Sequence, residues 1–181
     1  MPRLNQRLGL TRFEADEAYK QALDFYKKGD FDNAIDFMSK ALDALPSNSE
    51  YHAARGMMFL EDAEYDKAEE DFAESLRLFP YEMLAHYGRG MIAYRQKKWD
   101  AALEHFTKAH HARTDRPETL YYLGLVYYQR GEYANAVGVM AQANDLFEKA
   151  NDKRKSDAAK WLKELGKHKL PVQQSMLKES N

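Results

Sequence analysis

The stretch LGLVYYQRGEYANAVGVMAQA, residues 123–143, decides the fold. Its apolar and small side chains recur at helical spacing before and after Gly131, which interrupts the pattern. An alanine in this stretch is the last of four that are spaced 34 residues apart: Ala34, Ala68, Ala102 and Ala136. A repeat of this length indicates an array of similar units, each too small to bury its apolar face alone.

Four further columns keep the same interval of 34 residues without an insertion or deletion. One column holds small residues: Ala22, Gly56, Gly90 and Gly124. Another holds aromatic residues: Phe31, Tyr65, Trp99 and Tyr133. The remaining two hold large apolar residues (Met38, Phe72, Phe106, Met140) and small residues (Ala41, Ser75, Ala109, Ala143). Together they define four repeats, residues 15–48, 49–82, 83–116 and 117–150.

Each repeat predicts two helices joined by a short turn. In the first repeat, the helical spacing of apolar residues stops at Gly29 and resumes until Pro46, where a helix must end. The small columns let helices cross closely, because a larger side chain would hold their axes apart. Two pairs have the spacing of N-terminal capping boxes: Thr11 with Glu14, and Ser47 with Glu50. The sequence therefore predicts an all-α solenoid of helical hairpins.

This pattern resembles the tetratricopeptide repeat family over residues 15–150. The fourth repeat matches at Leu123, Gly124, Tyr127, Gly131, Tyr133, Ala136 and Ala143. The second matches at Gly56, Phe59, Tyr65, Ala68, Phe72 and Pro80. The chain departs from the family pattern at Thr114 and Glu148, which occupy its proline column, and at Ala93, where the other repeats have an aromatic residue. The resemblance implies a right-handed α-solenoid of four tandem helix-turn-helix repeats.

The two ends differ from the repeats. Residues 1–14 form a basic N-terminal segment, and residues 168–181 lack periodicity, which predicts a flexible tail. Residues 151–167 carry an apolar stripe at helical spacing: Ala158, Trp161, Leu162 and Leu165. Because the last repeat of a solenoid leaves an apolar face, we expect this stripe to belong to a capping helix.

Composition limits the classes of protein that fit. The 181 residues include 44% hydrophobic residues, enough for a core, and no cysteine, which excludes a disulfide framework and a thiol nucleophile. No apolar run has the length of a membrane span, and the first ten residues lack the apolar region of a secretory signal. We therefore expect a cytoplasmic protein.

Charge is unevenly distributed along the chain. Residues 13–148 carry 15 basic and 25 acidic side chains, whereas residues 1–12 carry three arginines and no acid. Residues 149–170 carry eight basic and three acidic side chains. An acidic body argues against a nucleic-acid surface, which needs clustered Lys and Arg. The densest acidic run, residues 61–74, is interpreted as a solvated helix face.

The sequence offers no sign of catalysis. It has no phosphate-binding glycine motif, and its serines fit caps or packing positions better than nucleophiles. His52 and His86 lie one repeat apart, whereas His110 and His111 are adjacent and must point to different faces of a helix. We therefore expect no enzymatic activity, no metal site and no cofactor.

The resemblance implies a protein-binding scaffold, because the first helices of similar family members line a concave groove. The fifth, ninth and twelfth residues of each repeat should face it. They are Tyr19, Leu23 and Tyr26; Ala53, Met57 and Leu60; Tyr87, Met91 and Tyr94; and Tyr121, Leu125 and Tyr128. Family members often have asparagine at the ninth position, and here it is always leucine or methionine.

We hypothesise that this apolar column, flanked by tyrosines, binds an amphipathic helix or apolar peptide of another protein. The alternative is that some of these residues are core between adjacent first helices. Charged or polar neighbours could form a rim: Lys27, Glu61, Arg95 and Gln129. Relatives that bind the C-terminal carboxylate of heat-shock chaperones use Lys, Asn and Arg. The matching positions here are Tyr19, Leu23, Ala54, Leu84 and Gly88, which disfavours that mode.

Two other hypotheses remain from the sequence. In the first, the protein self-associates, and its groove takes up its own terminal segment or another copy. In the second, the basic ends contact anionic membrane or RNA while the body recruits a partner.

Overall fold

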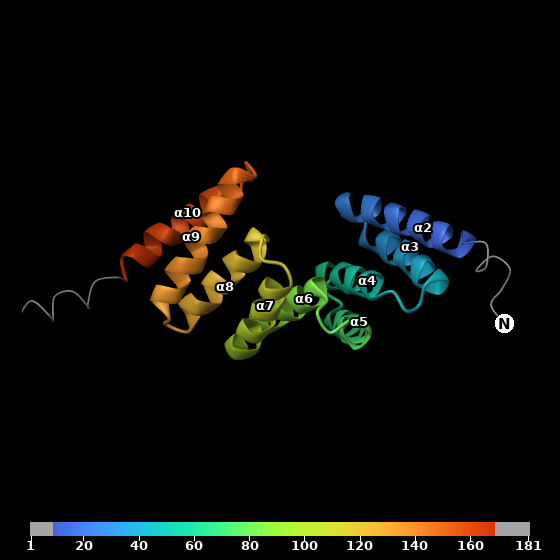
Figure 1. The fold of residues 1–181 in the computed structure, drawn as a ribbon, viewed down its shortest axis with the longest axis horizontal. Coiled ribbons are helices and arrows are strands. Elements are labelled where there is room, and N and C mark those ends of the chain that lie inside the picture. The colour runs from blue at the N-terminus through green and yellow to red at the C-terminus, as the bar shows by residue number, and fades with distance from the viewer. Residues whose placement is uncertain (1–8, 169–181) are drawn as a thin grey trace, which may run out of the picture. The chain divides into compact units, whose positions relative to one another are not determined.

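The computed structural model describes residues 9–168, apart from the side chain of Leu10, and this range is α-helical without a strand (Figure 1). The helices in this range are α2 (Leu10–Lys27), α3 (Phe31–Ala44), α4 (Ser49–Glu61), α5 (Tyr65–Leu78), α6 (Met83–Arg95), α7 (Trp99–Ala112), α8 (Pro117–Gln129), α9 (Tyr133–Lys149) and α10 (Lys155–Gly166). The all-α solenoid of helical hairpins predicted from the sequence is confirmed.

The chain forms two compact units that meet within α6. The first unit ends at Ile92 and the second begins at Ala93. In the first unit, α2 packs on α3, α3 on α4 and α4 on α5. In the second unit, α7 packs on α8, α8 on α9 and α9 on α10. Each unit therefore builds its core from helices that follow one another along the chain.

The turn inside each repeat has the same backbone conformation. Four residues spaced 34 apart have positive φ: Gly29 (76°), Ala63 (62°), Lys97 (58°) and Gly131 (75°). One residue later, an amide donates to a carbonyl five residues back, with N···O distances from 2.9 to 3.1 Å. This is the Schellman arrangement that ends a helix, in which glycine is the preferred residue.

The helix starts differ from the predicted capping boxes. α2 begins at Leu10 after Gly9, so Thr11 and Glu14 lie inside the helix and the basic segment 1–14 overlaps α2. At α4 the cap is Asn48, whose Oδ1 accepts from the Tyr51 amide at 3.2 Å. The prediction of a cap at Ser47 is therefore wrong by one residue, because Asn48 is an equally good capping side chain and lies closer to the first turn.

Phe72 on α5 shows how the small columns work. Its side chain is fully buried, and a Cβ added to Gly56 on α4 would lie 2.6 Å from its Cε1 atom. A Cβ added to Gly88 on α6 would lie 2.1 Å from its Cζ atom. The ring therefore rests directly on the backbones of two helices, and both glycines permit this approach.

The predicted capping helix is confirmed as α10, which packs on α9. Ala158 and Leu165 have no exposed surface, and Trp161 lies 5.1 Å from Tyr128 between ring centroids. Of the predicted tail, His168 is described and stacks on Tyr133 at 4.5 Å. Residues 169–181 of that tail, and residues 1–8 of the basic segment, lie outside the described residues.

Candidate functional site

In the first unit, two tyrosines from neighbouring first helices stack on each other. The rings of Tyr19 on α2 and Tyr51 on α4 lie 4.9 Å apart between centroids, with 21° between their planes. The Tyr19 hydroxyl donates to Glu50 Oε1 at 3.2 Å, and the Tyr51 hydroxyl donates to Asp16 Oδ1 at 2.8 Å. Each helix thus supplies one ring and one carboxylate, which fixes the two rings against each other.

A third carboxylate, Glu82, contributes to the electrostatics of this cluster. Burial, helped by the charges of Glu50 and Glu82, raises the pKa of Tyr19 to about 12. Burial also raises the pKa of Glu82, and the neighbouring charge of Glu50 adds to this effect. Both shifts show negative charge that is concentrated around partly desolvated side chains. Asp16, Glu50 and Glu82 were not candidate site residues in the sequence, because they occupy no shared repeat position.

Further along the same helices, the ninth-position residues Leu23 and Met57 are partly exposed. Leu23 packs against the core of the first unit together with Tyr19 and Tyr26. Tyr26 is also half-buried, and burial together with the charge of Glu61 raises its pKa. An apolar strip with some solvent access therefore follows the stacked tyrosine pair.

Two of the predicted groove residues on α4 do not reach the surface. Leu60 and Ala53 both have 0% exposed area, so neither offers a surface to a ligand and the prediction is wrong for them. Their column partner Tyr26 on α2 remains partly exposed because a tyrosine is long enough to carry its hydroxyl to the edge of the core. A leucine at the same repeat position stays beneath its neighbours.

On α6, Tyr87 and Met91 retain only 8% exposed area each. For these two residues the structure favours the alternative that ninth- and fifth-position residues are core. Little of their surface is available for binding without a rearrangement.

In the second unit, the helix α10 contacts the first-helix residues of the last repeat. Tyr128 packs edge-on against Trp161 and also contacts His168, with 5.7 Å between those ring centroids. Burial raises the pKa of Tyr121, and a hydrogen bond with Trp161 acts against this rise. Leu125 retains 6% exposed area. The capping helix therefore occupies much of the face that the sequence assigned to a ligand here.

Tyr94, at the end of α6, also belongs to an aromatic cluster of the second unit. Its ring meets Trp99 and Tyr122 edge-on, each with 5.5 Å between centroids. Burial raises its pKa. These contacts indicate a packing role for at least part of the ring.

The four predicted rim residues, Lys27, Glu61, Arg95 and Gln129, are all exposed. The Lys27 ammonium lies 3.4 Å from the Asp24 carboxylate one turn earlier. Their role as a rim stays a prediction.

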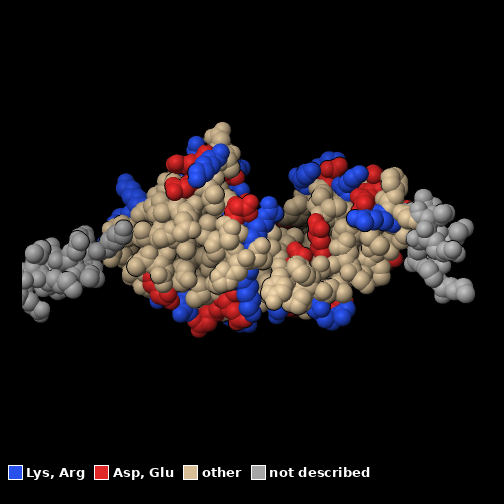
Figure 2. All heavy atoms as spheres, in the orientation of Figure 1, with Lys and Arg blue, Asp and Glu red and all other residues tan. Residues whose placement is uncertain are grey.

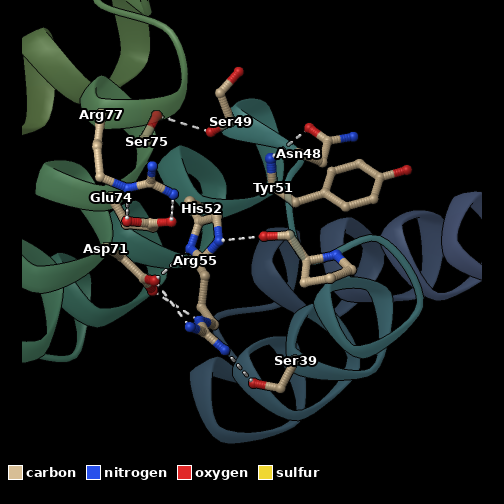
Figure 3. A network of polar contacts seen from close by, with 11 residues as sticks. Ser39, Asn48, Ser49, Tyr51, His52, Arg55, Asp71, Glu74, Ser75 and Arg77 are labelled. Atoms are coloured by element: carbon tan, nitrogen blue, oxygen red, sulfur yellow. Dashed lines mark hydrogen bonds and ion pairs between the residues drawn. The ribbon is translucent and has the colours of Figure 1, made fainter.

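A buried polar network links α3, α4 and α5 (Figure 3). The Asp71 carboxylate accepts two hydrogen bonds from the Arg55 guanidinium, at 2.7 and 2.9 Å, and lies 2.9 Å from His52 Nδ1. Arg55 also donates to Ser39 Oγ at 3.1 Å. Asp71 has 5% exposed area, so this member of the acidic run 61–74 does not lie on a solvated face as predicted.

The other ring nitrogen of His52 contacts the preceding linker. Its Nε2 atom lies 3.0 Å from the Pro46 carbonyl oxygen, and His86 Nε2 lies 3.0 Å from that of Pro80. The two histidines therefore do occupy equivalent places, as their spacing predicts. They tie the start of a first helix to the linker before it, which is a structural role.

A second surface of the first unit is a cleft of about 640 Å³ between α2 and α3. Phe13 and Phe37 line it, together with Glu14, Glu17 and Lys40. The Phe13 side chain is 68% exposed. This cleft was not predicted, because Phe13 lies before the first repeat in the sequence register.

Space-filling views show broad uncharged areas in each unit between charged groups of both signs (Figure 2). Within residues 9–168, no helix combines the length and hydropathy that a membrane crossing requires. In the same range, no group of three or more His, Asp or Glu side chains is arranged to hold a metal ion.

Comparison with family models identifies the repeats. A model described as tetratricopeptide repeat matches residues 19–82 and 59–117, which together span more than half of the chain. The chain belongs to the tetratricopeptide repeat family. A second model, described as anaphase-promoting complex, cyclosome, subunit 3, matches residues 95–169 of this tetratricopeptide repeat protein. No curated protein matches its sequence.

Several solved structures share the tetratricopeptide repeat fold. The Cut9–Hcn1 hetero-tetramer of APC/C aligns with a TM-score of 0.76 and 21% identity, over 87% of this chain and 31% of that chain. Pseudomonas aeruginosa pilF aligns with a TM-score of 0.67 and 21% identity, over 92% and 82%. The first TPR of Spaghetti (RPAP3), bound to the HSP90 peptide SRMEEVD, aligns with a TM-score of 0.59 and 20% identity, over 65% and 94%. At these identities the likeness shows the fold alone.

Proposed function

We propose that this protein is a protein-interaction scaffold that binds an apolar segment of a partner, as a helix or peptide, on the first-helix face of its first unit. Tetratricopeptide repeat proteins of the same fold include one bound to a peptide and one within a hetero-tetramer, which supports a protein partner. A cytoplasmic location stays a prediction from the sequence.

The observation that carries the proposal is the partial exposure of Leu23 and Met57 next to a fixed pair of tyrosines. Tyrosine offers a large apolar ring and one hydrogen bond, and methionine adapts its shape to different partners. Burial of both apolar side chains by a partner would contribute favourable free energy without a change in the fold. The last repeat is less suited, because α10 contacts its first helix.

The face differs from a site for the acidic end of a chaperone peptide. Tyr19, Leu23 and Ala54 occupy three of the positions at which carboxylate-binding relatives use Lys, Asn or Arg. The nearby charges are carboxylates, Asp16 and Glu50, which would repel an acidic peptide. Binding through apolar burial therefore fits this face better than capture of a terminal carboxylate.

The test is selection from a displayed library of helical peptides with fixed apolar positions and randomised polar positions. Peptides that bind the wild type are then measured against a Leu23→Glu/Met57→Glu variant. We expect at least about tenfold weaker binding, because two apolar contacts are replaced by charges. The matched control is Phe13→Glu, the same kind of change on α2 at the α2–α3 cleft, and it should leave affinity unchanged. Peptides that bind the folded double variant as tightly as the wild type would refute the proposal.

A further inference from the structure

The tyrosine pair of the first unit stands at the centre of three carboxylates. Asp16 and Glu50 accept from the two hydroxyls, and the charge of Glu82 acts on Tyr19 from α6's leading end. Glu82 also forms hydrogen bonds with the Leu84 amide and the Ser49 side chain, which fix its position. Three helices therefore direct acidic groups to one place on the proposed binding face.

None of these three carboxylates forms an ion pair with a basic side chain of the described residues. Other acids of α2 do: Glu17 lies 3.8 Å from the Lys20 ammonium, and Asp24 lies 3.4 Å from that of Lys27. Uncompensated like charges that are partly desolvated repel each other, so a cation from outside would lower the free energy of the cluster. Tyrosine rings add to this attraction, because the face of an aromatic ring carries negative potential.

We infer that this cluster binds a Lys or Arg side chain of a basic amphipathic helix, whose apolar residues lie on Leu23 and Met57. The inference rests on the proposed function and specifies the chemistry of its partner. An arginine fits best in principle, because its planar guanidinium can stack on a tyrosine while it donates to a carboxylate. Charge complementarity then sets the orientation of the helix, with its basic end at Tyr19 and its apolar face further along α2 and α4.

The same displayed library tests this partner chemistry. Peptides selected on the wild type are sequenced, and their affinities are measured at low and high salt. Each is measured again with an Asp16→Asn/Glu50→Gln/Glu82→Gln variant, in which every side chain keeps an acceptor oxygen. The matched control removes three exposed carboxylates from α3 instead: Asp32→Asn, Asp36→Asn and Asp43→Asn.

We expect the selected peptides to be enriched in Lys and Arg and to bind about tenfold more weakly to the first variant, since exposed ion pairs each contribute modestly. Their affinity should fall as salt rises, and the α3 control should stay within twofold of the wild type. Peptides that depend on Leu23 and Met57 but show no basic enrichment would overturn this inference and leave the proposed function standing. Basic peptides that lose equal affinity with both charge variants would also overturn it. If no selected peptide depends on Leu23 and Met57, the proposed function itself fails.

The enrichment and the salt dependence are measured on the wild-type protein. They therefore decide the question even if the triple variant does not fold. A library peptide that binds through Phe13 instead would place the interaction in the α2–α3 cleft and contradict both proposals.

Discussion

Replacing Gly88 by alanine tests the packing that holds the first unit together. A Cβ atom at this position would lie 2.1, 2.5 and 2.6 Å from three atoms of the Phe72 ring, whereas carbon atoms in contact lie about 3.5–4.0 Å apart. The ring cannot simply retreat, because it also rests on the Gly56 backbone. Overpacking of this kind costs about 1–3 kcal/mol, and alanine returns about 1 kcal/mol through its higher helix propensity.

Because the overlap exceeds 1 Å, we expect a cost at or above the upper end of that range and a net loss of about 2 kcal/mol. Urea unfolding followed by circular dichroism measures it, and Tm should fall by about 4–8 °C. Gly138→Ala is the control, since a Cβ there meets nothing within 4 Å, and it should stabilise α9 by about 0.5–1 kcal/mol. A Gly88→Ala variant as stable as the wild type would refute the close approach of α5 and α6.

Three further predictions concern stability. Lys97→Gly should raise the free energy of unfolding by about 1 kcal/mol, because glycine adopts positive φ without steric cost, and a Tm below that of the wild type would contradict this. Arg55→Met should lower the urea midpoint by an amount equivalent to about 3 kcal/mol, because it leaves the Asp71 carboxylate buried, and Arg55→Met/Asp71→Leu should recover most of the loss. Glu82→Gln should stabilise the protein at pH 7: its raised carboxyl pKa means that folding favours the protonated form, so the penalty of ionisation is absent below the ordinary pKa and grows as the pH rises through the folded-state pKa. Thermal melts at pH 7 and pH 4 measure this difference, which should shrink at the lower pH, and an equal difference at both values would contradict the assignment.

The fold could be predicted because every level of the sequence repeats the same instruction. The column that contains Phe72 and the small column that contains Gly56 meet in the core, as the reasoning about close helix crossings requires. The αL turn at Gly131 recurs at Lys97, where no glycine marks it. Periodicity therefore located a turn that the local residue type alone would have missed.

The binding face could be predicted only in part. Repeat position places Leu23 and Leu125 in one column, but α10 packs against the repeat that contains Leu125, so the two residues differ in exposure. The depth of Leu60 likewise depends on its neighbours in the core. Exposure is a property of the assembled unit, so a single repeat position cannot fix it.

The carboxylate cluster and the Asp71 network were missed for a related reason. Asp71 lies in a run of acids that reads as a solvated face, and its partner Arg55 comes from a different helix. A signal was present, because Asp71 is the one acid of that run directly before the buried Phe72 column. Charge pairing across helices carries no fixed spacing in the sequence, which is why it was not foreseen.

Methyl NMR of the methionines tests the central claim most directly, with a peptide selected on the wild-type protein as the probe. Met57 lies on the proposed face and is partly exposed, whereas Met38 and Met140 have no exposed surface. On titration, we expect the Met57 methyl signal to shift in proportion to bound peptide and the signals of Met38 and Met140 to stay in place. A bound peptide that leaves the Met57 signal unchanged would contradict the account, because the partner would then lie on another surface.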